Sequence, residues 1–272
     1  MIGLRKLFRM PLPELCLSER MLLRALMLPN LLLVRIEGGR LSGIREPNGT
    51  SPAIFAFNHN NAFESLFVPV LIMFLLGGRR VGFVIDWMYG HLPVIGWLMR
   101  KVKPIFVYTK RSTLPVLERR RDSTNSDVVG ECLRRLESGT SIGIFPEGKR
   151  NPDSSVLLRG RSGVGHIALR SGAPVIPVGI RFTASDRLGR APVIGRMVVR
   201  FGSPLRFDDT SAVYNQCLEE GRRGDAARMA AVASDEVMLA IADLCGKAYP
   251  HALQKPEEAV INHHTPEATC PA

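Results

Sequence analysis

The stretch AIFAFNHNNAFE, residues 53–64, joins an apolar run to a polar loop and then to the start of a second apolar run. The apolar residues 53–57 are typical of a strand buried on both faces, as in a parallel sheet covered by helices. Residues 61–76 have the length and composition of a helix. The stretch therefore predicts a strand, a loop and a helix, with His59 in the loop and Glu64 in the first helical turn.

The same order of elements continues along the chain. Further strands are predicted at 81–85, 104–108, 141–145, 174–182 and 192–201. Further helices are predicted at 93–102, 127–138, 162–171 and 225–246. Residues 34–44 are predicted to form a short hairpin around Gly38 and Gly39. Strands that alternate with helices indicate an α/β fold, a single domain whose largely parallel or mixed central sheet is flanked by helices.

Three regions follow from this pattern. Residues 1–33 are predicted to form an amphipathic helical arm that associates with a membrane, 34–249 the catalytic domain, and 250–272 a flexible tail. The apolar stretches 21–34 and 63–76 are each 14 residues long, whereas a spanning helix needs about 18 or more. We expect a chain that lies on a membrane without crossing it and carries no signal peptide; ordinary core helices are the alternative.

The charge of the chain restricts its partners. The net charge is +11, which predicts an anionic partner such as a membrane surface with anionic lipids, a nucleic acid or an acidic carrier. Only 7% of the residues are aromatic and no nucleic-acid motif is present, so we expect no nucleic-acid partner. The five cysteines lie far apart without a CxxC pair; this predicts reduced thiols, no disulfide and no metal site.

His59 and Glu64 suit acid–base chemistry. A carboxylate that reaches back to the imidazole fixes its tautomer, so that the other ring nitrogen can take a proton from a hydroxyl. In this interpretation the substrate supplies the nucleophile. The structural alternative is a capping box, in which Asn61 caps the helix and Glu64 returns to its backbone.

Two basic segments follow predicted strands. Glu147, Gly148, Lys149 and Arg150 come after the strand 141–145, and they suit either a polar, phosphorylated head group or a solvated turn. Lys110-Arg111 follows the strand 104–108 and has the same two interpretations. Because ligands bind at the carboxyl ends of strands in α/β sheets, both segments are candidate binding sites.

These segments together resemble the glycerolipid acyltransferases of the lysophosphatidic acid acyltransferase type. Asn58-His59 with Glu64 resembles the histidine–acid motif of that family, and residues 104–111 resemble its second block. Residues 145–150 (FPEGKR) are similar to its glutamate–glycine block and residues 173–178 (APVIPV) to its proline block. The resemblance covers residues 34–182, and the first and third motifs are specific in combination.

The resemblance implies roles for the candidate residues. His59 would be the general base and Glu64 would orient it. Lys110, Arg111 and the turn 147–150 would bind the substrate, with Glu147, Gly148 and Arg150 holding the acceptor head group. The family usually has Asp where this chain has Glu64, and its second block usually ends in Asp-Arg. These departures leave non-glycerol lysolipids open as acceptors.

The resemblance also implies the partners. No cofactor is expected; acyl-CoA or acyl carrier protein would be the co-substrate, and a lysolipid the acceptor. The expected location is the cytoplasmic face of a membrane, where the protein would be peripheral. A non-catalytic lipid-binding protein of the same fold is the rival hypothesis, and it predicts that His59 can be replaced without loss of function.

Overall fold

The computed structural model describes residues 4–37, 51–61, 63–87, 103–108, 115–118, 127–182 and 197–253. Within these residues the centre is a seven-stranded sheet of order β1-β7-β6-β2-β5-β3-β4. Its strands are β1 (Val34–Ile36), β2 (Ile54–Phe57), β3 (Val81–Asp86), β4 (Ile105–Val107), β5 (Ser141–Ile144), β6 (Val175–Phe182) and β7 (Met197–Phe201). Strands β2 to β7 confirm the six predicted strands.

The sheet is mixed. Adjacent strands run parallel except for β6 and β7, which are antiparallel. The predicted α/β fold with a largely parallel or mixed sheet is therefore confirmed. The strands β2, β5 and β6 lie side by side at its centre, so the carboxyl ends of these three strands meet at one edge.

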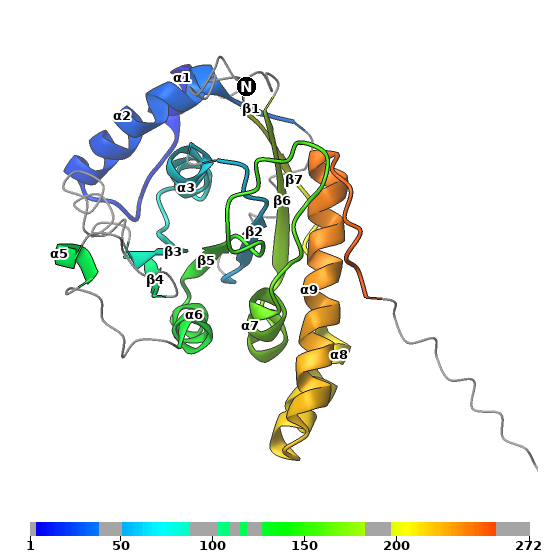
Figure 1. The fold of residues 1–272 in the computed structure, drawn as a ribbon. Helices are drawn as coiled ribbons and strands as arrows, with labels where there is room; N and C mark the ends of the chain where they lie inside the picture. Colours follow the sequence, from blue (N-terminus) through cyan, green and yellow to red (C-terminus); the bar gives the residue numbers. More distant parts are fainter. Residues whose placement is uncertain are drawn as a thin grey trace, which may run out of the picture.

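Helices cover both faces of the sheet (Figure 1). They are α1 (Leu4–Arg9), α2 (Leu17–Leu33), α3 (Glu64–Leu75), α5 (Pro115–Glu118), α6 (Val128–Glu137), α7 (Gly163–Ser171), α8 (Asp208–Glu219) and α9 (Arg223–Cys245). Phe55 and Phe57 of β2 pack in the core shared with α2 and α3, and Ile54 and Ala56 pack in the core shared with α6, α7 and α9. This alternation is the two-residue period of a strand that is buried on both faces.

The hairpin predicted at 34–44 stays a prediction. Its first part is β1, which pairs in parallel with β7, whereas residues 38–44 lie outside the described residues. An edge strand satisfies its backbone groups with whichever strand is adjacent in space, and here that strand is far along the chain. The predicted helix 93–102 and the tail from residue 254 also lie outside the described residues, and α8 was not predicted.

The N-terminal segment is helical, as predicted, and it packs on the domain. Leu7 of α1 and Leu23 and Met27 of α2 are buried in the core that includes α3. Arg24 fastens the two helices, because its Nη2 donates to the backbone carbonyls of Phe8 and Met10. None of the helices that the structure describes is both long enough and apolar enough to cross a bilayer.

Candidate active site

The loop that carries His59 is anchored by Asn58, whose side chain is fully buried. β2 ends at Phe57, which pairs with Val178 of β6. One residue later the Asn58 amide replaces this backbone pairing. Its Oδ1 accepts the N–H of Ile180 at 2.7 Å and its Nδ2 donates to the Ile180 carbonyl at 2.9 Å. The chain can therefore turn away from the sheet while these buried polar groups stay paired.

His59 and Glu64 form the predicted pair. The distance from His59 Nδ1 to Glu64 Oε1 is 2.7 Å. The Glu64 side chain is fully buried, whereas 16% of the His59 side chain is exposed. The imidazole packs on Phe145, with 4.5 Å between ring centroids. An ionised carboxylate accepts the Nδ1–H, which leaves Nε2 with its lone pair free to act as a base.

The Glu64 carboxylate has two further donors. Its Oε1 accepts the backbone N–H of Asn61 at 3.0 Å, and its Oε2 accepts the Asn60 amide at 3.2 Å. The Asn61 side chain accepts from the backbone N–H of Phe63 and not from Glu64. The N-cap of α3 is Phe63, and no side chain caps it. Asn61 therefore does not cap the helix as in the predicted capping box, although the Glu64 carboxylate does contact the Asn61 backbone while it holds the imidazole.

Burial dominates the protonation of Glu64. It raises the pKa of the Glu64 carboxyl above the ordinary range, although the hydrogen bonds from His59, Asn61 and Asn60 favour the ionised form and lower the pKa. Burial disfavours the charged form because the interior solvates it poorly. The pair is thus sensitive to any additional positive charge or dipole that stabilises the carboxylate.

Glu147 lies at the end of β5 and is buried. Its Oε1 accepts the backbone N–H of His59 at 2.8 Å, and its Oε2 accepts from the Asn151 amide and from the Leu158 N–H. Both oxygens are therefore engaged inside the protein. Binding of an acceptor head group by Glu147 stays a prediction, and these contacts give the carboxylate a different task, which is to hold the backbone of His59 in place.

Gly148 forms a tight turn after Glu147. Its φ is +66°, in the left-handed region that favours glycine. A Cβ atom at this position would lie 2.4 Å from Nε of Arg161. Arg161 is itself fixed at this turn, since its backbone N–H donates to the Pro146 carbonyl at 2.9 Å. The absent side chain of Gly148 thus leaves room for a guanidinium that the sequence analysis had not singled out.

The other predicted basic residues are placed only in part. Lys149 and Arg150 are exposed on the turn that follows β5. Lys110 and Arg111 lie outside the described residues. Binding of a substrate by these four residues stays a prediction. No cluster of three or more metal-binding side chains occurs in the ranges that the structure describes.

Lys247 also reaches the site and was missed. It follows α9, and its Nζ donates to Oδ1 of Asn60 at 2.6 Å. The two residues are 187 positions apart, and no motif joins them. The signal in the sequence beside Lys247 is Gly246, because glycine commonly ends helices. In the structure Gly246 ends α9 in a left-handed conformation.

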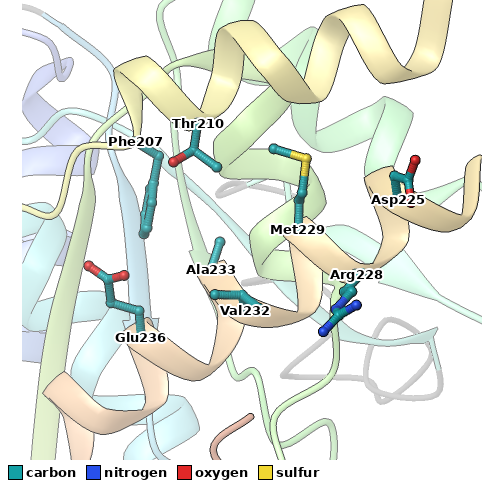
Figure 2. A pocket seen from close by; sticks show the side chains of 8 residues that line it. All are labelled: Phe207, Thr210, Asp225, Arg228, Met229, Val232, Ala233 and Glu236. Carbon is teal, nitrogen blue, oxygen red and sulfur yellow. The ribbon is translucent and has the colours of Figure 1, made fainter. Parts of the chain in front are cut away.

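A cavity of about 280 Å³ lies elsewhere, between α8 and α9 (Figure 2). Phe207, Thr210, Met229 and Ala233 contribute to its lining, and the charged residues Asp225, Arg228 and Glu236 surround them. None of its lining residues belongs to the loop after β2 or to the turn after β5. The cavity is therefore separate from the His59–Glu64 pair.

The chain is similar to several known proteins. Residues 35–181 match the family model described as Acyltransferase. Two chloroplastic 1-acyl-sn-glycerol-3-phosphate acyltransferases, from Brassica napus and Arabidopsis thaliana, are each 26% identical over 132 residues. The aligned part is 48% of this chain but only 33% and 32% of those relatives, so the match spans about a third of their length.

A solved structure is also similar. The crystal structure of the 1-acyl-sn-glycerophosphate acyltransferase PlsC from Thermotoga maritima aligns with a TM-score of 0.48 and 20% identity, over 75% of this chain and 76% of that one.

The sheet and the loop after β2 define a class of protein, an α/β domain with a histidine–carboxylate pair at the carboxyl edge of its sheet. Because the family model matches more than half of the chain, the chain belongs to the Acyltransferase family.

Proposed function

We propose that this chain is a membrane-associated O-acyltransferase. It transfers a fatty acyl group from acyl-CoA or acyl carrier protein to a hydroxyl of a lysophospholipid-type acceptor. The observation that carries the proposal is the contact of 2.7 Å between His59 Nδ1 and the buried Glu64 carboxylate. Membership of the Acyltransferase family supports it, as do the relatives named as 1-acyl-sn-glycerol-3-phosphate acyltransferases.

The first chemical step is proton removal. Nε2 of His59 takes the proton of the acceptor hydroxyl while Glu64 stabilises the resulting imidazolium through Nδ1–H. The hydroxyl oxygen attacks the thioester carbonyl, and a tetrahedral intermediate forms. The contact of the His59 backbone with Glu147 fixes the base relative to the end of β5. Fixed geometry lowers the barrier because little reorganisation remains to be done in the reaction.

The second step releases the carrier. The tetrahedral intermediate collapses, the carbon–sulfur bond breaks, and the thiolate takes the proton from His59 Nε2. The products are an ester and a free thiol, and His59 returns to its starting state. The proton count balances without a cofactor.

The acceptor class rests on charge. The exposed Lys149 and Arg150 lie on the turn after β5, and Arg161 is held against the same turn. Guanidinium and ammonium groups bind phosphate through charge-assisted hydrogen bonds. A 1-acyl-sn-glycerol 3-phosphate is therefore the first acceptor to test. The longer Glu64 side chain, where the resemblance leads us to expect Asp, makes a non-glycerol lysolipid the second.

The surface of α1 and α2 supports a membrane location. Large apolar side chains are exposed there although their neighbours on the same helices are buried. They are Leu4 and Phe8 of α1 and Leu17, Met21, Leu28 and Leu32 of α2. Arg5, Lys6 and Arg9 are exposed beside them on α1. An exposed apolar face with adjacent cations suits the interface of an anionic bilayer. We place this face on the cytoplasmic surface of a membrane as part of the proposal.

The test is acyl transfer by the purified full chain. Labelled acyl-CoA and labelled acyl carrier protein are each offered with a panel of lysolipids, and diacyl product is measured. We expect His59→Ala to lower kcat by about a hundred-fold or more, the usual contribution of a general base. Glu64→Gln is expected to lower kcat while leaving the binding of acceptor unchanged.

His251→Ala is the matched control, because His251 is exposed and lies outside the His59 loop. It is expected to keep the wild-type rate. Equal rates for wild type and His59→Ala would exclude His59 as the base. Lipid binding without any transfer by the wild type would favour the non-catalytic hypothesis instead.

A further inference from the structure

Lys247 is a buried cation that forms no ion pair within 4.0 Å among the described residues, although, after hydrogen bonds from Ser155, its charge also lowers the pKa of the Asp153 carboxyl. Only 8% of the residue is exposed. Its Nζ donates to Oδ1 of Asn60 and to the backbone carbonyl of Asp153, both at 2.6 Å. Among the described residues, no carboxylate oxygen lies within 4.0 Å of this ammonium group. Lysines are rarely buried unless they are paired, so this position requires a physical reason.

Glu64 presents the complementary case. Its carboxylate is fully buried, and His59 is its one ion-pair partner within 4.0 Å in the part of the chain that the structure describes. His59 is charged only when it is protonated, and a general base must be unprotonated to work. In the working state, therefore, the buried carboxylate has no adjacent cation.

Asn60 lies between the two. Its Oδ1 accepts from Lys247, while its Nδ2 donates to Glu64 Oε2 at 3.2 Å and to the Ile180 carbonyl at 3.1 Å. Lysine has only donors and an ionised carboxylate has only acceptors. The amide of Asn60 can satisfy both only in this orientation. Its dipole then points its positive end at the carboxylate and its negative end at the ammonium.

We infer that Lys247, Asn60 and Glu64 form an amide-bridged ion pair, and that Lys247 is a positioning residue for the His59–Glu64 base. The charge of Lys247 fixes and polarises the Asn60 amide, which favours the ionised form of Glu64. An ionised Glu64 accepts Nδ1–H and leaves Nε2 unprotonated. The inference deepens the proposed function and rests on it for the role of His59.

The bridge draws on a part of the chain outside the matched family region, which ends at residue 181. Gly246 ends α9 in a left-handed conformation, and Ala248 then pairs with the loop after β5 through Ser155 and Leu157. The last turn of α9 is thus fixed to the same loop that carries Asn151, the partner of Glu147. This arrangement fixes the position of Lys247 relative to Asn60.

A purely structural role is the competing explanation, because Lys247 also bonds the Asp153 carbonyl. The two explanations differ in what reaches His59. Among the described residues, the charged groups that hydrogen-bond to the imidazole or its loop are Glu64 at Nδ1, Glu147 at the His59 backbone and Lys247 through Asn60. Loosening the loop alone leaves these groups in place. Removing the ammonium leaves Glu64 without its bridged cation, which favours proton uptake by the pair.

The test measures His59 directly and needs no acyl substrate. Diethyl pyrocarbonate modifies unprotonated imidazole, and peptide mass spectrometry of the full chain follows the rate at His59 as a function of pH. For Lys247→Met we expect the midpoint of this profile to rise by about half to one pH unit, since the ammonium that polarises the Asn60 amide toward Glu64 is gone. Lys247→Gln, which keeps a hydrogen-bond donor but no charge, is expected to give the same rise.

Ser155→Ala is the matched control. The Ser155 hydroxyl donates to Oδ1 of Asp153, so its loss loosens the same loop and leaves Lys247, Asn60 and the charge of Asp153 in place. Its midpoint is expected to equal that of the wild type. In an Asn60→Ala background, Lys247→Met should add no further rise.

An unchanged midpoint in Lys247→Met and Lys247→Gln would overturn the inference, as would an equal rise in Ser155→Ala. The acyl-transfer assay separates this outcome from failure of the proposed function. If the wild type transfers acyl groups but the Lys247 variants show no shift in midpoint, only the amide-bridged ion pair is contradicted. If the midpoint shifts but the wild type transfers no acyl group, the bridge is supported and the proposed acyltransferase function is contradicted.

Discussion

Glu64 makes stability depend on pH in a direction set by its burial. Burial raises the pKa of its carboxyl, so the folded chain binds this proton more tightly than the unfolded chain does. The contribution of Glu64 to stability is therefore largest below the unfolded pKa, about 4.3, and falls as the pH rises toward the folded value. We expect the free energy of unfolding of wild type, minus that of Glu64→Gln, to fall over this window. Urea unfolding at a series of pH values measures the difference.

The comparison with Glu64→Gln removes the other acids. Several exposed or half-exposed carboxyls have pKa values lowered by hydrogen bonds and adjacent cations. Their contribution to the stability of the folded chain is lost as the pH falls. These are Glu19, Glu37, Glu131, Asp153 and Glu220. They occur in both proteins and cancel in the difference. A difference that grows with pH would show that hydrogen bonds outweigh burial at Glu64.

At Gly148 a single added carbon atom is expected to change the stability of the folded chain. Alanine at Gly148 would be strained at a φ of +66° and would place Cβ 2.4 Å from Nε of Arg161. Alanine at Gly139 meets the same backbone strain at +78° but nothing within 4 Å. Left-handed strain costs about 1–2 kcal/mol, so Gly139→Ala should lose that amount of unfolding free energy, and Gly148→Ala should lose more.

The double variant Gly148→Ala with Arg161→Ala isolates the contact in the same unfolding measurements. Without the guanidinium, the destabilisation should fall to the value of Gly139→Ala. If Gly148→Ala and Gly139→Ala are equally destabilised, Arg161 moves aside freely and the turn does not fix it.

At the scale of residues, the sequence predicts contacts that are local and misses those that are not. His59 and Glu64 are five residues apart, and the strand–loop–helix pattern brings them together. The binding of the His59 backbone by Glu147 spans 88 residues. It depends on the register of β2 against β5, which no local pattern specifies. Lys247 is more distant still, so its place beside Asn60 emerges only from the assembled fold.

The membrane hypothesis can be tested at the scale of one element, α2. Leu17 and Leu32 are 74% and 76% exposed, so glutamate at both positions adds charge to the proposed lipid face without disturbing the core. Burying one leucine side chain contributes about 1.5–3 kcal/mol. We therefore expect the double variant to bind anionic phospholipid vesicles about ten-fold or more weakly in a sedimentation assay.

Leu239→Glu is the control for this measurement. Leu239 is a similar apolar side chain, 45% exposed, but it lies on α9. It should bind vesicles as the wild type does. Equal weakening by both changes would mean that added negative charge, and not the face of α2, determines binding.

Element by element, apolar strands were the most predictable part of the fold. β2 to β7 each match a predicted strand because burial on the two faces requires a continuous apolar run. The helix α8 was missed, since its first turn is polar, with Asp208 and Asp209, and few of its residues are buried. The glycines at 38 and 39 indicate a turn, but they could not identify β7 as a partner of β1.

The whole molecule carries a net charge of +11, and this predicts a salt dependence. Binding to anionic vesicles should weaken when the ionic strength rises from about 0.05 M to about 0.5 M, because the screening length shortens several-fold. The apolar contacts of α2 are not screened, so a residual affinity should remain at high salt. Vesicles of neutral lipid should show this residual affinity at both salt concentrations. An affinity for anionic vesicles that ignores salt would contradict the prediction.

The strand order could not be predicted from the sequence. Every central strand is apolar on both faces, so many orders would bury similar area, and long-range packing selects among them. β1 occupies the edge beside β7, where Arg200 of β7 bonds Glu37 across 163 residues.

Because β1 pairs with β7, this edge of the sheet can be completed only late in synthesis. α2 runs directly into β1, and the strand that pairs with β1 among the described residues, β7, forms only after it leaves the ribosome. At about 5–20 residues per second, the gap of 163 residues lasts roughly ten to thirty seconds. During that interval the outer apolar residues of α2 remain exposed, while α3 can already cover its inner side. The nascent chain can therefore meet a bilayer before its sheet is complete, and attachment would then precede the final folding step.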